Sequence, residues 1–106
     1  MTVTADRQAA LEFKRRLEEI TTVLDVRMFG SRAREDAAPD SDLDVFVEVD
    51  ALTPELQHRI DEIAWEVGFE RDFIICPVVV TRDELQHGPL RASPLILNIE
   101  REGVSL

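Results

Sequence analysis

Two stretches of the chain carry apolar residues at the spacing of an amphipathic helix, with charged residues between them. The first stripe predicts a helix over 5–21, which Thr4 can cap; its members are Ala10, Phe13, Leu17 and Ile20. The second predicts a helix that Thr53 caps and Pro54 opens, with Gly68 placed to end it. Its apolar members are Leu56, Ile60, Ile63, Ala64 and Val67. Each helix is therefore expected to bury one face and expose the other.

Three further stretches have the composition of β-strands. They span 23–29, 43–49 and 73–80. In the second stretch, alternate residues are expected to face a core: Leu43, Val45, Val47 and Val49. Asp42 and Asp44 then face the other side, because successive side chains of a strand point in opposite directions. The third stretch is the most apolar and predicts a buried central strand, although Pro77 within it favours an edge or a bulge.

The last part of the chain predicts two short helices. A capping box at Thr81 and Glu84 opens the first, and Ser93-Pro94 opens the second. The elements run helix, strand, strand, helix, strand, helix, without a linker or a repeat. This order predicts a single domain over residues 1–106 with an α/β (α+β) fold, a small mixed β-sheet with helices packed mainly on one face.

Composition narrows the classes of protein to consider. The chain has 106 residues, a net charge of −10 and a calculated pI of about 4.5. Direct binding to nucleic acid is disfavoured, because an acidic surface repels phosphate backbones. The single cysteine, Cys76, excludes an internal disulfide and a Cys-rich zinc site, and is predicted to be a small buried hydrophobe.

No secretory signal and no apolar run of about 18 residues is present, so a cytoplasmic protein without membrane contact is expected. A chain this small has little stability to spare, which leaves room for a homodimer or another protein partner.

The residues with candidate chemistry lie between the first two predicted strands. Gly30-Ser31 follows the first strand, and a loop over 35–41 comes next. Asp42-Leu43-Asp44 starts the second strand, with ten residues between Ser31 and Asp42. Two carboxylates on one strand face can hold a divalent cation, while a glycine, a hydroxyl and an arginine such as Arg34 can hold phosphates. Taken alone, Asp-x-Asp can equally be a solvated turn, and Arg32 and Arg34 can be surface residues in ion pairs.

The stretch from Phe29 to Val47 resembles the nucleotidyltransferase superfamily that includes DNA polymerase β. It is most similar to the minimal nucleotidyltransferases (MNT), short domains that often pair with a HEPN-domain protein in toxin–antitoxin modules. The shared signature is Gly-Ser, a spacer near ten residues, and Asp-x-Asp.

The resemblance implies transfer of a nucleoside monophosphate, AMP from ATP, to a hydroxyl of a protein partner, a HEPN-type toxin. It implies Mg²⁺ held by Asp42 and Asp44 as metal-binding and catalytic residues, and nucleotide held by Gly30, Ser31 and Arg34.

Two positions depart from the family pattern. Active members usually carry a third carboxylate on the strand after the second helix, near Ile74 or Cys76 here, where this chain has no acid. Asp72 stands just before that strand and could substitute. Glu35 occupies a place where minimal members commonly have glycine.

These departures leave an alternative open, a degenerate nucleotidyltransferase fold that neutralises a partner by binding alone. Transfer to a small molecule such as an aminoglycoside, within an oligomer, is a third hypothesis.

Overall fold

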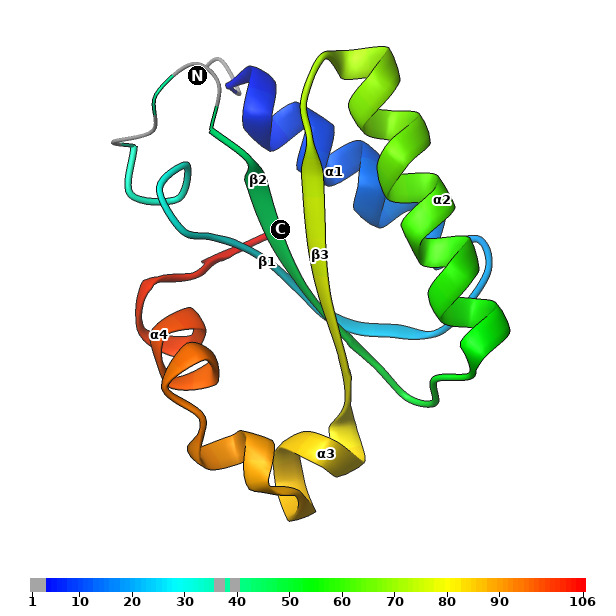
Figure 1. The fold of residues 1–106 in the computed structure, drawn as a ribbon, viewed down its shortest axis with the longest axis vertical. Coiled ribbons are helices and arrows are strands. Elements are labelled where there is room, and N and C mark those ends of the chain that lie inside the picture. The colour runs from blue at the N-terminus through cyan, green and yellow to red at the C-terminus, as the bar shows by residue number, and fades with distance from the viewer. Residues whose placement is uncertain (1–3, 36–37, 39–40) are drawn as a thin grey trace.

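The computed structural model describes residues 4–35, 38 and 41–106, so part of the loop predicted over 35–41 lies outside the described residues. Its centre is a four-stranded sheet in the order β3-β2-β1-β4 (Figure 1). The strands are β1 (Val23–Phe29), β2 (Leu43–Val49), β3 (Ile75–Thr81) and β4 (Val104–Ser105). β1 runs antiparallel to β2 and β4, whereas β2 and β3 are parallel. The predicted mixed sheet is confirmed.

The two long helices, α1 (Ala5–Glu18) and α2 (Pro54–Arg71), pack together on one face of this sheet (Figure 1). The core between them and the sheet is aliphatic, with the alternate residues of β2 at its centre. Its largest fully buried side chains include Phe13, Leu17, Leu43, Val45, Val47, Val49, Ile60, Ile63 and Val67. The predicted inward face of β2 is confirmed, and so are the predicted stripes of both helices except at Ile20, which lies beyond α1 and is 40% exposed.

A smaller apolar cluster covers part of the other sheet face. It joins Phe46 and Val80 of the sheet to Ile96 and Ile99 of α4 (Pro94–Glu102). α3 (Arg82–His87) and a 3₁₀ turn (Pro89–Ala92) connect β3 to α4. None of the helices in the described part of the chain is long and apolar enough to cross a membrane.

Helix ends differ from the prediction at two places. α1 ends at Glu18, before the predicted Thr21, and α2 continues through Gly68 to Arg71. Asp72 ends α2 in the left-handed conformation, with φ 64° and ψ 44°. Gly68 is needed for another reason, since a Cβ there would lie 2.4 Å from the Phe73 carbonyl oxygen. It permits the chain leaving α2 to turn back closely against the helix.

The third strand differs as well. β3 begins at Ile75 and pairs only with β2, so it is an edge strand of the sheet and the prediction of a central strand was wrong. The edge position suits Pro77, which cannot donate a ladder hydrogen bond. The predicted capping box at the end of β3 is present, with the Thr81 hydroxyl accepting from the Glu84 N–H at 3.1 Å.

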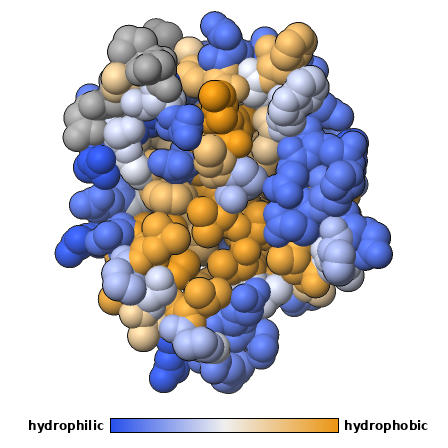
Figure 2. Space-filling model, in the orientation of Figure 1, coloured by the Kyte–Doolittle hydropathy of each residue, from blue (hydrophilic) through white to orange (hydrophobic). Residues whose placement is uncertain are grey.

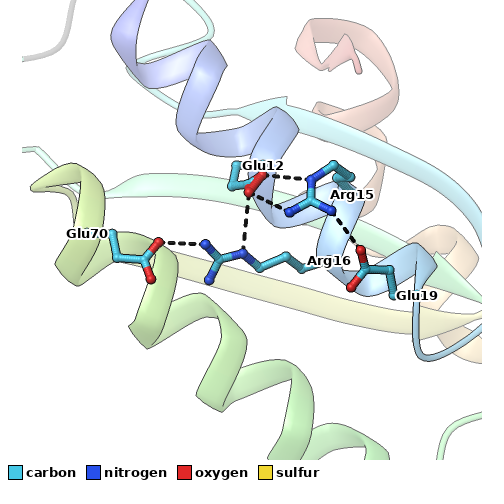
Figure 3. Close-up of polar contacts among 5 residues, drawn as sticks. All are labelled: Glu12, Arg15, Arg16, Glu19 and Glu70. Atoms are coloured by element: carbon cyan, nitrogen blue, oxygen red, sulfur yellow. Dashed lines mark hydrogen bonds and ion pairs between the residues drawn. The ribbon is translucent and has the colours of Figure 1, made fainter.

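Charged residues join the two long helices at their surface (Figure 3). Arg16 of α1 is paired with both Glu12 of the same helix and Glu70 of α2. Arg15 donates two hydrogen bonds to Glu12, at 2.9 and 2.8 Å. These hydrogen bonds, with the charges of both arginines, lower the pKa of Glu12 to about 2. Glu12, Glu19 and Glu70 are therefore paired with arginines at this surface.

Candidate functional site

Two carboxylates lie on the sheet face opposite the long helices. Asp44 belongs to β2, and Asp42 directly precedes it. Leu43 between them is fully buried in the main core, so its neighbours project to the other face. Burial, and next the charge of Asp42, raise the pKa of Asp44. The fold thus holds two negative charges near each other, an arrangement that a divalent cation would stabilise.

Gly30 brings the end of β1 against this pair. It has φ +76°, and a Cβ at this position would lie 2.4 Å from Oδ2 of Asp44. Phe29 is paired with Asp44 in the sheet, which fixes the register of this contact. A glycine is therefore required both by the backbone conformation and by the space that the carboxylate occupies.

A tight turn over 31–35 follows Gly30. The N–H groups of Ala33 and Arg34 both donate to the Gly30 carbonyl oxygen at 3.1 Å. Glu35 ends the turn with φ 63°, a conformation that strongly favours glycine. Glu35, at the position where the resemblance implies glycine, thus has a left-handed backbone conformation.

The two arginines of the turn have different surroundings. Arg32 donates from Nε and Nη2 to the Ser41 carbonyl oxygen, at 3.0 and 2.8 Å, and its guanidinium lies 4.8 Å from the centre of the Phe73 ring. It connects the turn to the residue before Asp42. Arg34 is 47% exposed and lies 3.5 Å from Glu102 of α4. A weak surface pair of this kind can be exchanged for a phosphate group.

Cys76 lies with the carboxylates. It is paired with Asp44 across β2 and β3, and its thiol lies 3.5 Å from Oδ2 of Asp42. Burial, and then the hydrogen bond to Asp42, raise the pKa of the thiol. The prediction of a buried hydrophobe was wrong, since Cys76 is only partly buried and its sulfur faces the site.

The other two candidates for a third acid are placed elsewhere. Ile74 is 67% exposed at the sheet edge. Asp72 ends α2 and lines a groove between α2 and β3. No contact recorded among the described residues joins Asp72 to Asp42 or Asp44. Of the three positions, only Cys76 contacts the carboxylate pair.

The comparison with known families agrees with this geometry. The sequence profile of the nucleotidyltransferase domain family matches residues 8–100. This chain belongs to that family. The resemblance noted for Gly30-Ser31 and Asp42-Leu43-Asp44 is thereby confirmed for the family as a whole. No curated protein matches this nucleotidyltransferase in sequence.

Solved structures share its fold at low identity. A toxin–antitoxin structure with AMP-PNP has a TM-score of 0.62 and 19% identity, over 92% of this chain and 69% of that chain. A structure of a mutant of the toxin–antitoxin MntA–HpeT has a TM-score of 0.62 and 16% identity, over 97% of this chain and 72% of that chain. The complex of a tri-AMPylated Shewanella oneidensis HEPN toxin with an MNT antitoxin has a TM-score of 0.57 and 17% identity, over 94% of this chain and 70% of that chain. At these identities the likeness establishes the fold.

The donor set of this nucleotidyltransferase fits one mode of metal binding. No group of three His, Cys, Asp or Glu side chains that could hold a metal is present among residues 4–35, 38 and 41–106. Mg²⁺ is commonly bound by one or two carboxylates together with substrate phosphates and water. Asp42 and Asp44 fit that mode, whereas the soft Cys76 thiol is a poor ligand for magnesium.

Sequence reasoning missed two features of the site. Cys76 was named as one position where the resemblance implies a third acid, but the contact of its thiol with Asp42 was not predicted; it follows once β3 is aligned parallel to β2. The link from Arg32 to Ser41 and Phe73 depends on how α2 and β3 pack, for which the sequence carries no local signal.

Proposed function

We propose that this nucleotidyltransferase transfers AMP from ATP, with Mg²⁺, to a hydroxyl of a HEPN-type protein partner, as the antitoxin of such a pair. The observation that carries the proposal is the close approach of the Gly30 backbone to Asp44, whose side chain projects to the same sheet face as that of Asp42. Because Gly30 has no side chain, its backbone lies directly beside the Asp44 carboxylate, and a phosphate held by that backbone would lie close to both aspartates. The complexes with AMP-PNP and with an AMPylated HEPN toxin, which share the fold, support the choice of nucleotide and of acceptor.

Each residue would have a separate task in the reaction. Asp42 and Asp44 would hold Mg²⁺, which when bound neutralises charge on the phosphoryl and leaving oxygens. The backbone at Gly30 and the Ser31 hydroxyl would hold the β- and γ-phosphates, and Arg34 would exchange Glu102 for a phosphate oxygen. The acceptor oxygen then bonds to the α-phosphorus as the bond to the bridging oxygen breaks, and pyrophosphate leaves.

Calorimetry with ATP, with and without Mg²⁺, tests the nucleotide site. Wild type is expected to bind ATP only with Mg²⁺, and Asp42→Asn/Asp44→Asn to lose that binding. Asp50→Asn is the matched control, because Asp50 is an exposed acid just beyond the other end of β2. Absence of magnesium-dependent binding in wild type would exclude the proposed transfer.

Transfer itself is tested with ATP labelled at the α-phosphate and a HEPN-type protein. Label in the partner, lost in Asp42→Asn/Asp44→Asn, is the expected result.

One alternative is binding of a partner without transfer. Cys76 favours it, because a thiol, a poor ligand for magnesium, stands at a position implied for the third carboxylate. That alternative predicts a stable complex with the partner but no label in it.

A further inference from the structure

A groove of about 750 Å³ lies between α2 and the start of β3, outside the carboxylate pair. Its apolar lining includes Trp65 and Phe69 of α2 and Ile74 before β3. These side chains are 69%, 76% and 67% exposed, high values for residues of this size. The two aromatic rings are stacked, with their centres 5.4 Å apart and an angle of 12° between their planes. A contiguous exposed apolar surface of this kind is typical of an interaction site.

The charges around the groove indicate the sign of its partner. Asp61 and Asp72, at either end of the aromatic pair, also line the groove, eleven residues apart. In the described part of the chain, neither carboxylate has an ion pair, although Asp61 accepts a hydrogen bond from Gln57 at 3.1 Å. Their separation corresponds to about 16 Å along a helix. The groove therefore offers two negative charges on either side of an apolar centre.

Among the described residues that line the groove, none offers a positive charge that is not already engaged. Arg32 is the lining residue with a positive charge, and its guanidinium is already engaged with the Ser41 carbonyl and the Phe73 ring. A second copy of this chain would add another net charge of −10. Repulsion of like charge disfavours that occupant and favours a basic one.

The neighbouring sheet edge limits the shape of the partner. β3 is an edge strand, but Pro77 in its middle removes a backbone donor, and this weakens pairing with an added strand. A helix needs no such donors and can lay an apolar stripe into a groove.

We propose that this groove docks a basic amphipathic helix of a partner protein. Its apolar residues would pack on Trp65, Phe69 and Ile74, and its Lys or Arg residues would face Asp61 and Asp72. Ser41, which adjoins Asp42, lines the same groove, so the docked partner would lie beside the carboxylates. That last step deepens the proposed function and rests on it, whereas docking requires no nucleotide.

The test uses a labelled synthetic peptide of leucine and lysine at amphipathic helical spacing, with a scrambled isomer of the same composition. Binding is followed by fluorescence anisotropy without nucleotide. Trp65→Ala/Phe69→Ala is expected to weaken binding of the helical peptide at least tenfold. The matched control is Leu95→Ala/Leu97→Ala, which removes two exposed apolar side chains of α4 and should leave binding unchanged.

A second pair of variants tests the charges. Asp61→Asn/Asp72→Asn should weaken binding about threefold to tenfold, as expected for two partly exposed ion pairs. Asp50→Asn/Asp83→Asn makes the same change in net charge elsewhere and should have little effect. Asn at position 72 tolerates the left-handed conformation, so this variant is expected to fold.

Two results would overturn the proposal. Equal binding of the scrambled peptide, or an equal loss in Asp50→Asn/Asp83→Asn, would show attraction to the net charge alone, and an equal loss in Leu95→Ala/Leu97→Ala would show that the peptide does not select this groove. A concentration-dependent dimer by sedimentation, abolished by Trp65→Ala/Phe69→Ala, would show that a second copy occupies the groove. Neither result depends on ATP, so both are distinguishable from failure of the nucleotide site.

Discussion

The acids on the two sides of the sheet are held in opposite ways. Beside the long helices, Glu12 lies between Arg15 and Arg16, and its pKa falls to about 2 (Figure 3). On the other face, the pKa of Asp44 is raised by burial and by its neighbour Asp42. No ion pair of Asp42 or Asp44 is recorded in the described part of the chain. The Glu12 carboxylate is neutralised by arginines of its own helix, whereas the Asp42–Asp44 pair has no such partner among the described residues.

The apolar residues differ between the two faces as well. Under α1 and α2, the inward side chains of β2 are fully buried. The opposite face is covered by only a small cluster around Phe46 and α4, and apolar residues remain visible in the middle of that face (Figure 2). The fold therefore derives its stability mainly from one face and leaves the other accessible. The following predictions separate residues that stabilise the fold from residues that would bind a ligand.

Leu43→Ala should have the largest effect, because Leu43 is fully buried in the main core between the two aspartates. Removing its side chain is expected to cost about 3 kcal/mol in the free energy of unfolding, from lost burial and the cavity left behind. Urea denaturation measures this. Leu97→Ala, at a half-exposed position on α4, is the control and should cost far less. A loss below about 1 kcal/mol would contradict the assignment of this face to stability.

The sequence predicted one face of β2 better than the other. The bounds of β1 and β2 and the inward residues followed from alternation, which is a local property of the chain. Gly30 and the Asp42–Asp44 pair followed from a motif of fixed spacing. The edge position of β3 and the contact of Cys76 depend on which strands pair, and alternation does not determine that. Gly68 does not end α2 as predicted. Glycine is favoured both at a helix end and where two backbone segments approach closely, and the sequence does not distinguish the two.

Cys76→Asp tests metal binding on the sheet face that carries Asp42 and Asp44. A carboxylate there would join Asp42 and Asp44 and give magnesium a third oxygen ligand. We expect Mg²⁺-dependent ATP affinity to rise about tenfold, which corresponds to ~1.4 kcal/mol. Without metal, the added repulsion should lower the melting temperature. Cys76→Ser is the control, and it should change neither quantity by a comparable amount. Unchanged ATP affinity in Cys76→Asp would mean that this position does not reach the metal.

Glu12→Gln tests how much the pairing of Glu12 with Arg15 and Arg16 stabilises the fold. The pKa of Glu12 is about 2, below its usual value of 4.5, so the ionised group stabilises the folded state above pH 4.5. This contribution is lost as the pH falls from 4.5 towards 2. At pH 7 the variant should be less stable by about 1 kcal/mol, a value limited by exposure to solvent. Denaturation at pH 7 and pH 2.5 measures the difference, which should narrow at the lower pH. Glu18→Gln, at an exposed acid of the same helix, is the matched control for the removal of one negative charge.

Asp44→Asn should have the smallest effect on stability and the opposite sign. Because the pKa of Asp44 is raised in the folded protein, the folded state binds its proton more readily than the unfolded chain does. Wild type therefore loses stability as the pH rises through this titration, and the variant does not. At pH 7 without metal, Asp44→Asn should be more stable by about 0.5 kcal/mol, a value discounted for solvent screening. Saturating Mg²⁺ and ATP should reverse the order, since a ligand that binds only the folded wild type stabilises it. Thermal denaturation with and without ligand measures both. If the variant were less stable than wild type without ligand, Asp44 would be a structural residue, and the contrast between the two faces would fail at this position.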